Sequence, residues 1–346
     1  MAKTLIVRYS QIGDVLILLP ILNSLARQYP EDEFTVLTNP KFSGIFKQMP
    51  SNVFLYPMVY RKQNIPLRGL VHLFHRYKLL IKFFFSKKYD KVAVFQDGTF
   101  DFQLGKILSA KGSKVTSIDF SDFFSKKRLQ KKDDLTLFKM YLDLLSRLDY
   151  HNLNNEFDLS YYTATERQNS VLQSVGIDRQ KMLIGIAPFS RIDAKMYPLA
   201  KMEKVIEYYH NHREDVQIII LGGGEQEKQK ADEWKERYPK IESLINRLSF
   251  DEEMTIISTC KTVVSMDSAN MHLAALVGTP VISIWGPGDP RLGFYPVNEK
   301  EEHAVQKQLS CRPCSFWGEI PCVNPNTYEC MDIDPQIIID KINNAI

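Results

Sequence analysis

Residues 262–290, TVVSMDSANMHLAALVGTPVISIWGPGDP, have the pattern of a buried strand, an acidic turn, a helix and a second buried strand. The first apolar run ends at Asp267, and residues 268–277 have helical spacing. Gly278 and Pro280 end that helix, because glycine favours the left-handed position after a helix and proline cannot continue one. This order predicts a parallel α/β sheet, which binds ligands at the carboxyl ends of its strands.

The turn at Asp267 is a candidate anion site. Free backbone N–H groups and the positive end of the following helix would both face an anion such as a diphosphate. His272 lies one helical turn after Asp267 and is expected to reach the same ligand. The alternative is structural: Asp267 and Ser268 cap a helix, and His272 is a packed polar residue.

A similar strand–turn–helix unit opens the chain. Residues 4–8 form an apolar strand pattern, residues 9–14 (YSQIGD) a turn, and residues 15–29 a helix. Gly13 gives the backbone freedom at the helix entry, and Asp14 is either a site carboxylate or a helix cap. No G-x-G-x-x-G sequence is present, so a dinucleotide fingerprint is not supported.

Two further loops carry suitable chemistry for a nucleotide. In the loop over residues 188–198 (PFSRIDAKMYP), Ser190 and Lys195 supply a hydroxyl and an ammonium before a helix, which suits a diphosphate; a solvated basic loop is the alternative. Three glycines at residues 222–224 follow a strand and precede Glu227. A carboxylate there can bind ribose hydroxyls, or it simply favours the helix N-terminus.

Strand and helix patterns alternate in two sets along the 346 residues. They predict an N-terminal α/β domain over residues 1–175 and a C-terminal α/β domain over residues 176–330. The last helix, over residues 331–346, is expected to pack back on the N-terminal domain. A short basic segment over residues 125–132 is expected to be a loop.

The charge is distributed unevenly. Residues 1–150 carry 24 Lys and Arg against 13 Asp and Glu, whereas residues 151–346 carry 20 against 28. No acidic residue occurs between Phe34 and Tyr89. A field of one sign favours an anionic partner. The helical pattern over residues 68–89 fits a core-packed helix or one that docks on an anionic membrane surface.

The composition of the chain also bears on the cellular location of the protein and on the classes of partner it binds. The chain shows neither a signal peptide nor an apolar run of the ~20 residues that a membrane span needs. We therefore expect a cytoplasmic protein, with peripheral contact at the cytoplasmic face of the inner membrane left open, and no nucleic-acid partner.

Four cysteines gather near the C-terminus, at Cys311, Cys314, Cys322 and Cys330. Their first C-x2-C spacing is typical of zinc ligands, but a second such pair is missing. We interpret the segment as structural, with buried thiols and no metal, and a structural zinc site is the less favoured alternative.

Together these motifs resemble the heptosyltransferase family, glycosyltransferase family 9. Residues 10–14 match its Ser-x-x-Gly-Asp turn, and residues 195–198 match Lys-x-Trp-Pro with tyrosine for tryptophan. Residues 267–272 match Asp-Ser/Thr-Gly-x-x-His, and residues 286–290 match Gly-Pro-Thr-Asp-Pro. The cysteine segment also resembles a tail that the family often carries before its last helix.

The resemblance implies an α/β fold of the GT-B class, two doubly wound Rossmann-like domains facing across a cleft. It implies an inverting glycosyltransferase that moves a heptose or related sugar from a nucleotide-diphosphate donor, expected to be ADP-heptose, to a lipopolysaccharide inner-core or other surface-glycan acceptor. No cofactor or metal is expected. In this assignment Asp14 is the general base. The expected donor-binding residues are Ser190, Lys195, Glu227, Asp267, Ser268, Ala269 and His272, and the expected acceptor-binding residues are Ser10, Gly13, Arg61 and Lys62.

Two residues differ from the family's motifs, so the identity of the donor sugar is left open. Ala269 replaces the family's glycine, and Gly288 replaces its threonine. Two alternatives therefore remain. One is a nucleotide-sugar epimerase or hydrolase on the same fold, and the other is a non-catalytic member that binds a nucleotide sugar.

Overall fold

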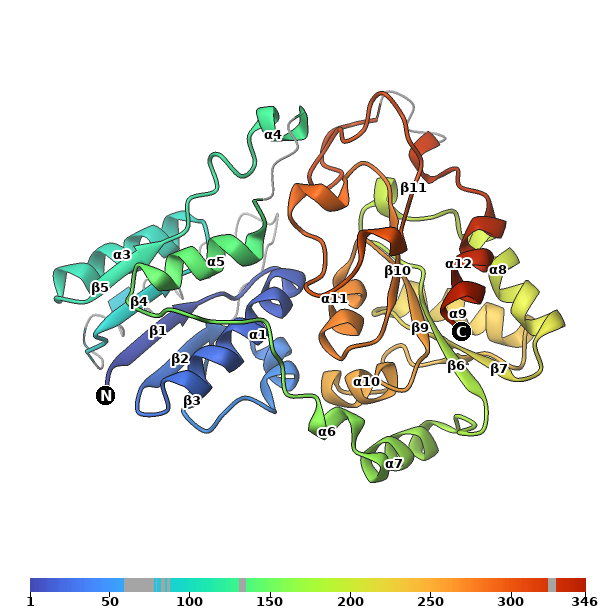
Figure 1. Ribbon diagram of the computed structural model, residues 1–346, viewed down its shortest axis with the longest axis horizontal. Helices are drawn as coiled ribbons and strands as arrows, with labels where there is room; N and C mark the ends of the chain where they lie inside the picture. The colour runs from blue at the N-terminus through green and yellow to red at the C-terminus, as the bar shows by residue number, and fades with distance from the viewer. Residues whose placement is uncertain (59–77, 79, 82–84, 86–87, 131–134, 323–327) are drawn as a thin grey trace. The chain divides into compact units, whose positions relative to one another are not determined.

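The computed structural model describes residues 1–346 except 59–77, 79, 82–84, 86–87, 131–134 and 323–327 (Figure 1). The chain forms two compact units. Unit 1 contains Met1–Phe123 and Leu137–Phe157, and unit 2 contains Phe124–Thr136 and Asp158–Ile346. Most of the helix expected over residues 68–89 lies outside the described residues.

Unit 1 is built on a five-stranded parallel sheet with the strand order β3-β2-β1-β4-β5 (Figure 1). Its strands are β1 (Lys3–Val7), β2 (Glu33–Thr38), β3 (Val53–Pro57), β4 (Lys91–Val94) and β5 (Lys114–Ser117). Its described helices are α1 (Ile12–Gln28), η1 (Pro40–Phe46), α3 (Thr99–Ala110) and α5 (Leu137–Ser146).

Helices cover both faces of this sheet. Leu5 and Val7 of β1 pack in one apolar cluster with Leu104 of α3. The hydroxyl of Thr4 instead lies 2.7 Å from that of Tyr150, which follows α5. Because alternate strand residues point to opposite faces, α3 and the α5 segment cover opposite faces of the sheet.

Unit 2 contains a six-stranded parallel sheet with the order β11-β10-β9-β6-β7-β8. Its strands are β6 (Met182–Ala187), β7 (Val216–Ile220), β8 (Glu242–Ser243), β9 (Thr262–Met266), β10 (Val281–Trp285) and β11 (Ala304–Gln306). Its described helices are α4 (Lys126–Gln130), α6 (Ser160–Thr163), α7 (Thr165–Val175), η2 (Asp193–Lys195), α8 (Leu199–His212), α9 (Glu225–Arg237), α10 (Phe250–Ile257), α11 (Ala269–Leu276), η3 (Pro290–Leu292), η4 (Glu301–His303), η5 (Glu329–Met331) and α12 (Pro335–Ala345).

The last helix, which the sequence pattern predicted to pack back on the N-terminal domain, is grouped with unit 2. Ile338, Ile339 and Ile342 of α12 are buried in the same core as Met202 and Tyr209 of α8 (Figure 1). The apolar stripe of α12 shows that the helix is buried on one side, but it does not identify the surface that buries it.

The domain boundary expected at residues 175/176 lies too far along the chain. The units divide at Phe157/Asp158, and α7 lies in unit 2. Arg167 of α7 donates to the Asp251 carboxylate at 2.9 Å and to the Thr255 hydroxyl at 2.8 Å, both on α10. These side-chain bonds tie the helix to the domain that follows it.

The segment expected to be a loop at residues 125–132 contains the short helix α4, and it also belongs to unit 2. The ring of Phe124 stacks on Phe294 at 6.0 Å and lies 4.2 Å from Trp317. Arg128 donates to the carbonyl oxygen of Leu135 at 2.7 Å. Aromatic contacts remote in sequence therefore hold a segment whose local pattern is weak.

Among the described residues, no helix combines the length and the apolar character that crossing a membrane requires.

Candidate active site

In unit 1, polar side chains gather where β1 and β4 end. Arg8 follows β1, and its guanidinium donates to the Asp14 carboxylate and to the backbone carbonyl of Phe95, which follows β4. The side chain of Arg8 is 4% exposed and that of Asp14 is 21% exposed. Asp14 is therefore held by a buried cation while part of its carboxylate stays open to solvent.

Arg8 remains charged in this buried position. Burial disfavours the charged guanidinium, but Tyr141 and Asp14 outweigh that effect and raise the pKa of Arg8 above its ordinary value. Burial also raises the pKa of Tyr141, whose ring centre lies 5.9 Å from the Arg8 guanidinium carbon. The Tyr141 ring thus covers the Arg8 guanidinium on one side.

The first turn of α1 positions the other predicted residues of this motif. The N-cap residue is Gln11, so the interpretation of Asp14 as the cap is wrong. Ser10 donates its backbone N–H to the Gln96 side-chain oxygen at 3.3 Å, and Gly13 lies inside the helix. Arg61 and Lys62, the predicted acceptor residues, lie outside the described residues.

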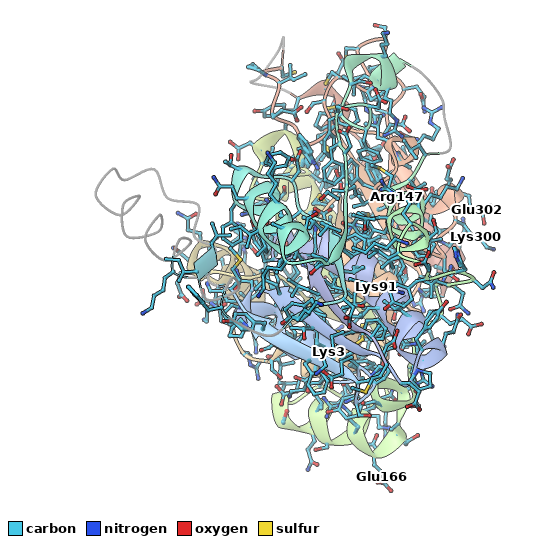
Figure 2. The ribbon with its side chains drawn as sticks, turned by 90° about the vertical axis from the view of Figure 1, so that its left-hand side faces the viewer. Lys3, Lys91, Arg147, Glu166, Lys300 and Glu302 are labelled. Atoms are coloured by element: carbon cyan, nitrogen blue, oxygen red, sulfur yellow. The ribbon has the colours of Figure 1, made fainter. Side chains whose placement is uncertain are left out.

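Sequence reasoning missed three polar residues at this end of the sheet. One is Arg8, and the other two are Tyr9 and Asp101, whose hydroxyl and carboxylate lie 2.8 Å apart in the core. One signal was available: an arginine closes the apolar strand run at residues 4–8, where a parallel sheet presents its ligand-binding groups. By contrast, Lys3 and Lys91 begin β1 and β4 and so lie at the opposite, amino ends of those strands (Figure 2).

In unit 2 the structure brings two predicted donor residues into contact. Lys195 ends η2, Asp267 follows β9, and the Lys195 ammonium lies 2.5 Å from the Asp267 carboxylate. Their side chains are 9% and 12% exposed. A nearly buried lysine needs a counterion, and Asp267 is that counterion here.

Four further predicted donor residues lie on the loop before Lys195 or at and within α11. The Ser190 hydroxyl accepts from the Ile192 backbone N–H at 3.2 Å and so closes the loop that carries Lys195. Ser268 is the N-cap residue of α11, and its hydroxyl lies 3.2 Å from that of Ser265. Ala269 and His272 both lie within α11, where His272 is buried.

Glu227 stabilises the glycine turn that precedes its own helix. Its carboxylate accepts from the Gly223 backbone N–H at 2.8 Å. Burial raises the pKa of Glu227, and this hydrogen bond offsets part of that increase. A Cβ added at Gly222 would lie 2.6 Å from the same carboxylate, so a larger residue there would displace the Glu227 side chain. The described contacts of Glu227 are with this turn and not with Lys195 or Asp267.

The loop after β10, residues 286–290, lies against both residues of the ion pair. A Cβ added at Gly286 would lie 2.5 Å from the carbonyl oxygen of Ala194, the residue before Lys195. A Cβ added at Gly288 would lie 3.8 Å from the Asp267 carboxylate and no closer than 3.7 Å to any neighbour. Gly286 is therefore sterically required, whereas Gly288 is not.

The cysteine segment packs on this same loop. The backbone N–H of Cys314 donates to the Pro287 carbonyl oxygen at 3.0 Å. Burial raises the pKa of the Cys314 and Cys330 thiols, which disfavours their thiolate forms. Among the described residues, no group of three or more His, Cys, Asp and Glu side chains is arranged to hold a metal ion.

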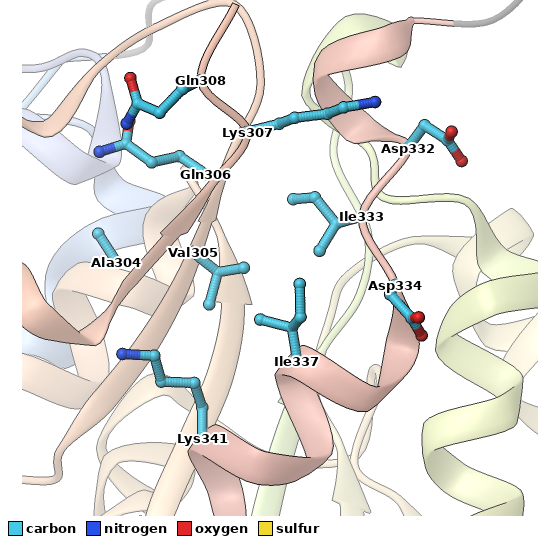
Figure 3. Close-up of a pocket in the computed structure, with 10 residues that line it drawn as sticks. All are labelled: Ala304, Val305, Gln306, Lys307, Gln308, Asp332, Ile333, Asp334, Ile337 and Lys341. Atoms are coloured by element: carbon cyan, nitrogen blue, oxygen red, sulfur yellow. The ribbon is translucent and has the colours of Figure 1, made fainter.

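A separate cavity of about 390 Å³ lies between the edge strand β11 and α12. Figure 3 shows Ile333 and Ile337 on the opposite side of this space from Val305. Lys307 and Lys341 also line it, but no predicted site residue does. The cavity is therefore distinct from the Lys195–Asp267 pair.

Comparisons with known proteins bear on the family and the fold of this chain. The model of glycosyltransferase family 9 (heptosyltransferase) matches residues 109–319. Lipopolysaccharide heptosyltransferase 3 of Escherichia coli is 26% identical over 286 residues, which cover 80% of this chain and 81% of that protein. Lipooligosaccharide heptosyltransferase 2 of Campylobacter jejuni is 21% identical over 346 residues, which cover 97% and 95%.

A solved structure extends the agreement to the fold. The E. coli ADP-heptose lipopolysaccharide heptosyltransferase II matches with a TM-score of 0.71 at 16% identity, over 99% of this chain and 98% of that one. At this identity the match establishes the fold. The expected GT-B class, with its two parallel α/β sheets, is thereby confirmed.

Proposed function

Because the chain belongs to glycosyltransferase family 9, the heptosyltransferase family, and is a glycosyltransferase, we propose that it transfers heptose from ADP-heptose to the inner core of lipopolysaccharide. The observation that carries this proposal is the nearly buried Lys195–Asp267 pair, which lies on the loop and the turn predicted to bind the donor. The relatives support the choice of substrates, since they are named for lipopolysaccharide and lipooligosaccharide heptosyl transfer.

The donor diphosphate is the leaving group, and it is proposed to bind beside Lys195. Residues 151–346 carry more acidic than basic side chains, so a diphosphate there needs local cations and N–H donors. The Lys195 ammonium supplies the cation, and its contact with Asp267 orients it before the donor arrives. A preorganised cation stabilises the negative charge that develops on the departing phosphate.

Asp14 is proposed to act on the acceptor. Arg8 binds the Oδ2 atom of Asp14, so in this proposal Oδ1 receives the proton of the acceptor hydroxyl. The acceptor oxygen then forms a bond to the anomeric carbon, while the bond from that carbon to the diphosphate oxygen breaks. The electron pair of the broken bond leaves on ADP, and the configuration at the anomeric carbon inverts.

The acceptor is proposed to be an anionic glycolipid. Residues 1–150 have an excess of basic side chains, which suits the phosphate and carboxylate groups of such a molecule. Ser10 and Gly13 adjoin Asp14 in the chain and are proposed to contact the accepting sugar, together with Arg61 and Lys62. This surplus of positive charge also favours peripheral contact with an anionic membrane surface.

The direct test is a transfer assay with a panel of donors and acceptors. ADP-heptose is compared with other ADP-, UDP- and GDP-sugars, and truncated lipopolysaccharides that end at successive inner-core sugars serve as acceptors. We expect ADP release that depends on the acceptor, and a mass gain of one heptosyl group.

The same assay separates the alternatives. Sugar release or isomerisation without an acceptor would favour an epimerase or a hydrolase. Nucleotide binding without turnover of any donor would favour a non-catalytic member of the family.

A further inference from the structure

Arg312 makes an unusual set of bonds beside the predicted donor loop. Its Nε donates to the carbonyl oxygen of Gly286 at 2.5 Å, and one terminal nitrogen donates to that of Gly288 at 2.7 Å. The other terminal nitrogen donates to the carbonyl oxygen of Lys307 at 2.5 Å. One guanidinium thus joins two carbonyls of the loop to the chain that leaves β11.

The fork geometry explains why an arginine occupies this position. The planar guanidinium presents five N–H donors in fixed directions, and a lysine ammonium cannot reproduce that arrangement. Arg312 also lies 3.1 Å from the side-chain oxygen of Gln306, so it binds four acceptors, none of which is a carboxylate. Burial lowers the pKa of Arg312, although Asp289 and the nearby cysteines counteract this effect.

The loop that Arg312 holds lies beside Asp267 and beside Ala194, the residue before Lys195. Gly286 packs directly on the carbonyl of Ala194, and Gly288 lies beside the carboxylate of Asp267. A shift of the loop would therefore change the position of both charged groups. The hydrogen bonds from Arg312 fix the carbonyls of Gly286 and Gly288 and therefore fix the loop. A fixed loop in turn limits the movement of Lys195 and Asp267.

The cysteine segment adds a second support on the same side. A Cβ added at Gly318 would lie 2.8 Å from Ile192 and 3.4 Å from Pro287. The cysteine segment therefore touches both the loop over residues 286–290 and the turn before Lys195. Gly318 has a φ of +79°, a conformation that favours glycine. Residues 312–318 therefore pack on the loop over residues 286–290, and the Arg312 guanidinium donates two of the hydrogen bonds between the two segments.

We propose that Arg312 is a positioning residue for the donor: it fixes residues 286–290 and thereby holds Lys195 and Asp267 in the geometry that binds a nucleoside diphosphate. This role rests on the proposed function, because that function assigns the diphosphate to the Lys195–Asp267 pair. Arg312 itself need not touch the donor.

The test measures nucleotide affinity and loop protection in the full chain. Arg312→Ala and Arg312→Lys are compared with wild type by calorimetric titration of ADP, UDP and GDP, and by hydrogen exchange of the peptide that contains residues 286–290. Arg213→Ala is the matched control, because Arg213 forms a two-bond ion pair with Asp215 elsewhere in unit 2.

We expect Arg312→Ala to weaken nucleoside diphosphate binding about tenfold or more, since charge-assisted hydrogen bonds to the loop are lost. Exchange in the loop should become faster even without nucleotide, and Arg312→Lys should lie between wild type and alanine. The dissociation constant refers to folded protein only, so a purely structural role would lower the binding stoichiometry and the melting temperature without changing the affinity.

The outcomes also separate the two claims. If wild type binds a nucleotide and Arg312→Ala binds it equally well with unchanged loop exchange, the positioning role is wrong and the proposed function stands. If wild type binds none of the three nucleotides, the proposed function fails, and the donor role of Arg312 fails with it.

Discussion

Lys195 and Asp267 form a nearly buried ion pair, which we propose binds the donor diphosphate. Each side chain is nearly buried, and each would be costly to desolvate alone. The contact between the two charges offsets the cost of desolvating each of them. It also places an ammonium where we propose that the diphosphate binds. The pair is therefore expected to matter more for donor affinity than for stability.

Replacing Lys195 by alanine should weaken ADP binding roughly 10- to 100-fold, because a charge-assisted contact is lost and Asp267 then repels the phosphates. Titration calorimetry measures this change. Lys228→Ala is the control, since Lys228 pairs with Asp232 at the same 2.5 Å distance but on the surface of α9. Equal affinity in wild type and Lys195→Ala would show that the loop over residues 188–198 does not bind the donor diphosphate through Lys195.

Glu253 of α10 links stability to pH. Burial raises the pKa of Glu253 to about 7. A carboxyl whose folded pKa is raised stabilises the protein fully below its unfolded pKa, near 4.5, and loses that contribution as pH rises through about 7.

Glu253→Gln should therefore raise the melting temperature at pH 8 by roughly 7–14 °C while leaving it unchanged at pH 4.5. Thermal unfolding followed by circular dichroism at both pH values measures the difference. Glu236→Gln, on the charged helix α9, provides a comparison with no such expectation. A gain of the same size at both pH values would contradict the explanation.

Some of the candidate site could be predicted from the sequence and some could not. The position of Asp267 follows from where the apolar run of β9 stops, and that of Asp14 from the turn and helix pattern after the first strand. Lys195 follows from a motif. Arg8 was absent from the predicted site because an arginine at the end of a strand has many structural uses. Arg312 was missed because its partners are backbone carbonyls, and a sequence does not reveal which carbonyls converge.

At the scale of elements, the turn after β10 has one glycine that is required and one that is not. Gly286 has no room for a Cβ beside the Ala194 carbonyl, whereas Gly288 has ordinary van der Waals space. The departure from the family's threonine at Gly288 therefore has no steric cause at its Cβ. The tight approach of the loop to η2 depends on Gly286 instead.

Gly286→Ala should destabilise the protein by about 1–3 kcal/mol, because overpacking must displace the backbone of η2 or of the loop. It should also weaken nucleotide binding. Gly288→Ala is the matched control and should change neither quantity appreciably. Chemical denaturation and ADP titration of both variants test the difference, and indistinguishable variants would refute the packing argument.

Elements with a strong local pattern were predicted well. The bounds of β6, α8 and β10 coincide with apolar runs, turn residues and helical spacing that are visible in the sequence. The short helix α4 was missed, since its stability comes from contacts such as Phe124 on Phe294 that are remote in sequence. Residues 243–248 include an apolar run but contribute only the end of the two-residue strand β8. Because β8 pairs over only two residues, the apolar side chains of this run contribute more to the hydrophobic core than to the sheet.

At the scale of the whole molecule, the chain passes between its two units three times, after Phe123, Thr136 and Phe157. Sequence patterns indicated two α/β domains because strand and helix signals alternate in two sets. They could not indicate that Phe124–Thr136 joins unit 2 or that α12 remains there, because both facts depend on contacts between distant segments.

The uneven charge makes acceptor use sensitive to salt. Raising the ionic strength from about 50 mM to about 500 mM should lower kcat/KM for the acceptor roughly three- to tenfold, because exposed charges are screened. The KM for ADP-heptose should change less, since the Lys195–Asp267 pair is nearly buried. Initial rates at fixed saturating concentrations of the other substrate give both constants. Equal salt dependence for donor and acceptor would argue against an electrostatic role for the basic residues of the first 150.

The central claim, heptosyl transfer with Asp14 as the base, is tested most directly by single-turnover transfer from ADP-heptose to truncated lipopolysaccharide, with wild type and Asp14→Asn compared at saturating donor. Asparagine keeps the shape of the side chain and can still accept from Arg8, but it cannot take a proton. We predict transfer by wild type, a rate about 10²- to 10⁴-fold lower in the variant, and unchanged ADP affinity. Transfer by Asp14→Asn at a rate close to that of wild type, or no transfer from ADP-heptose by wild type, would contradict the claim.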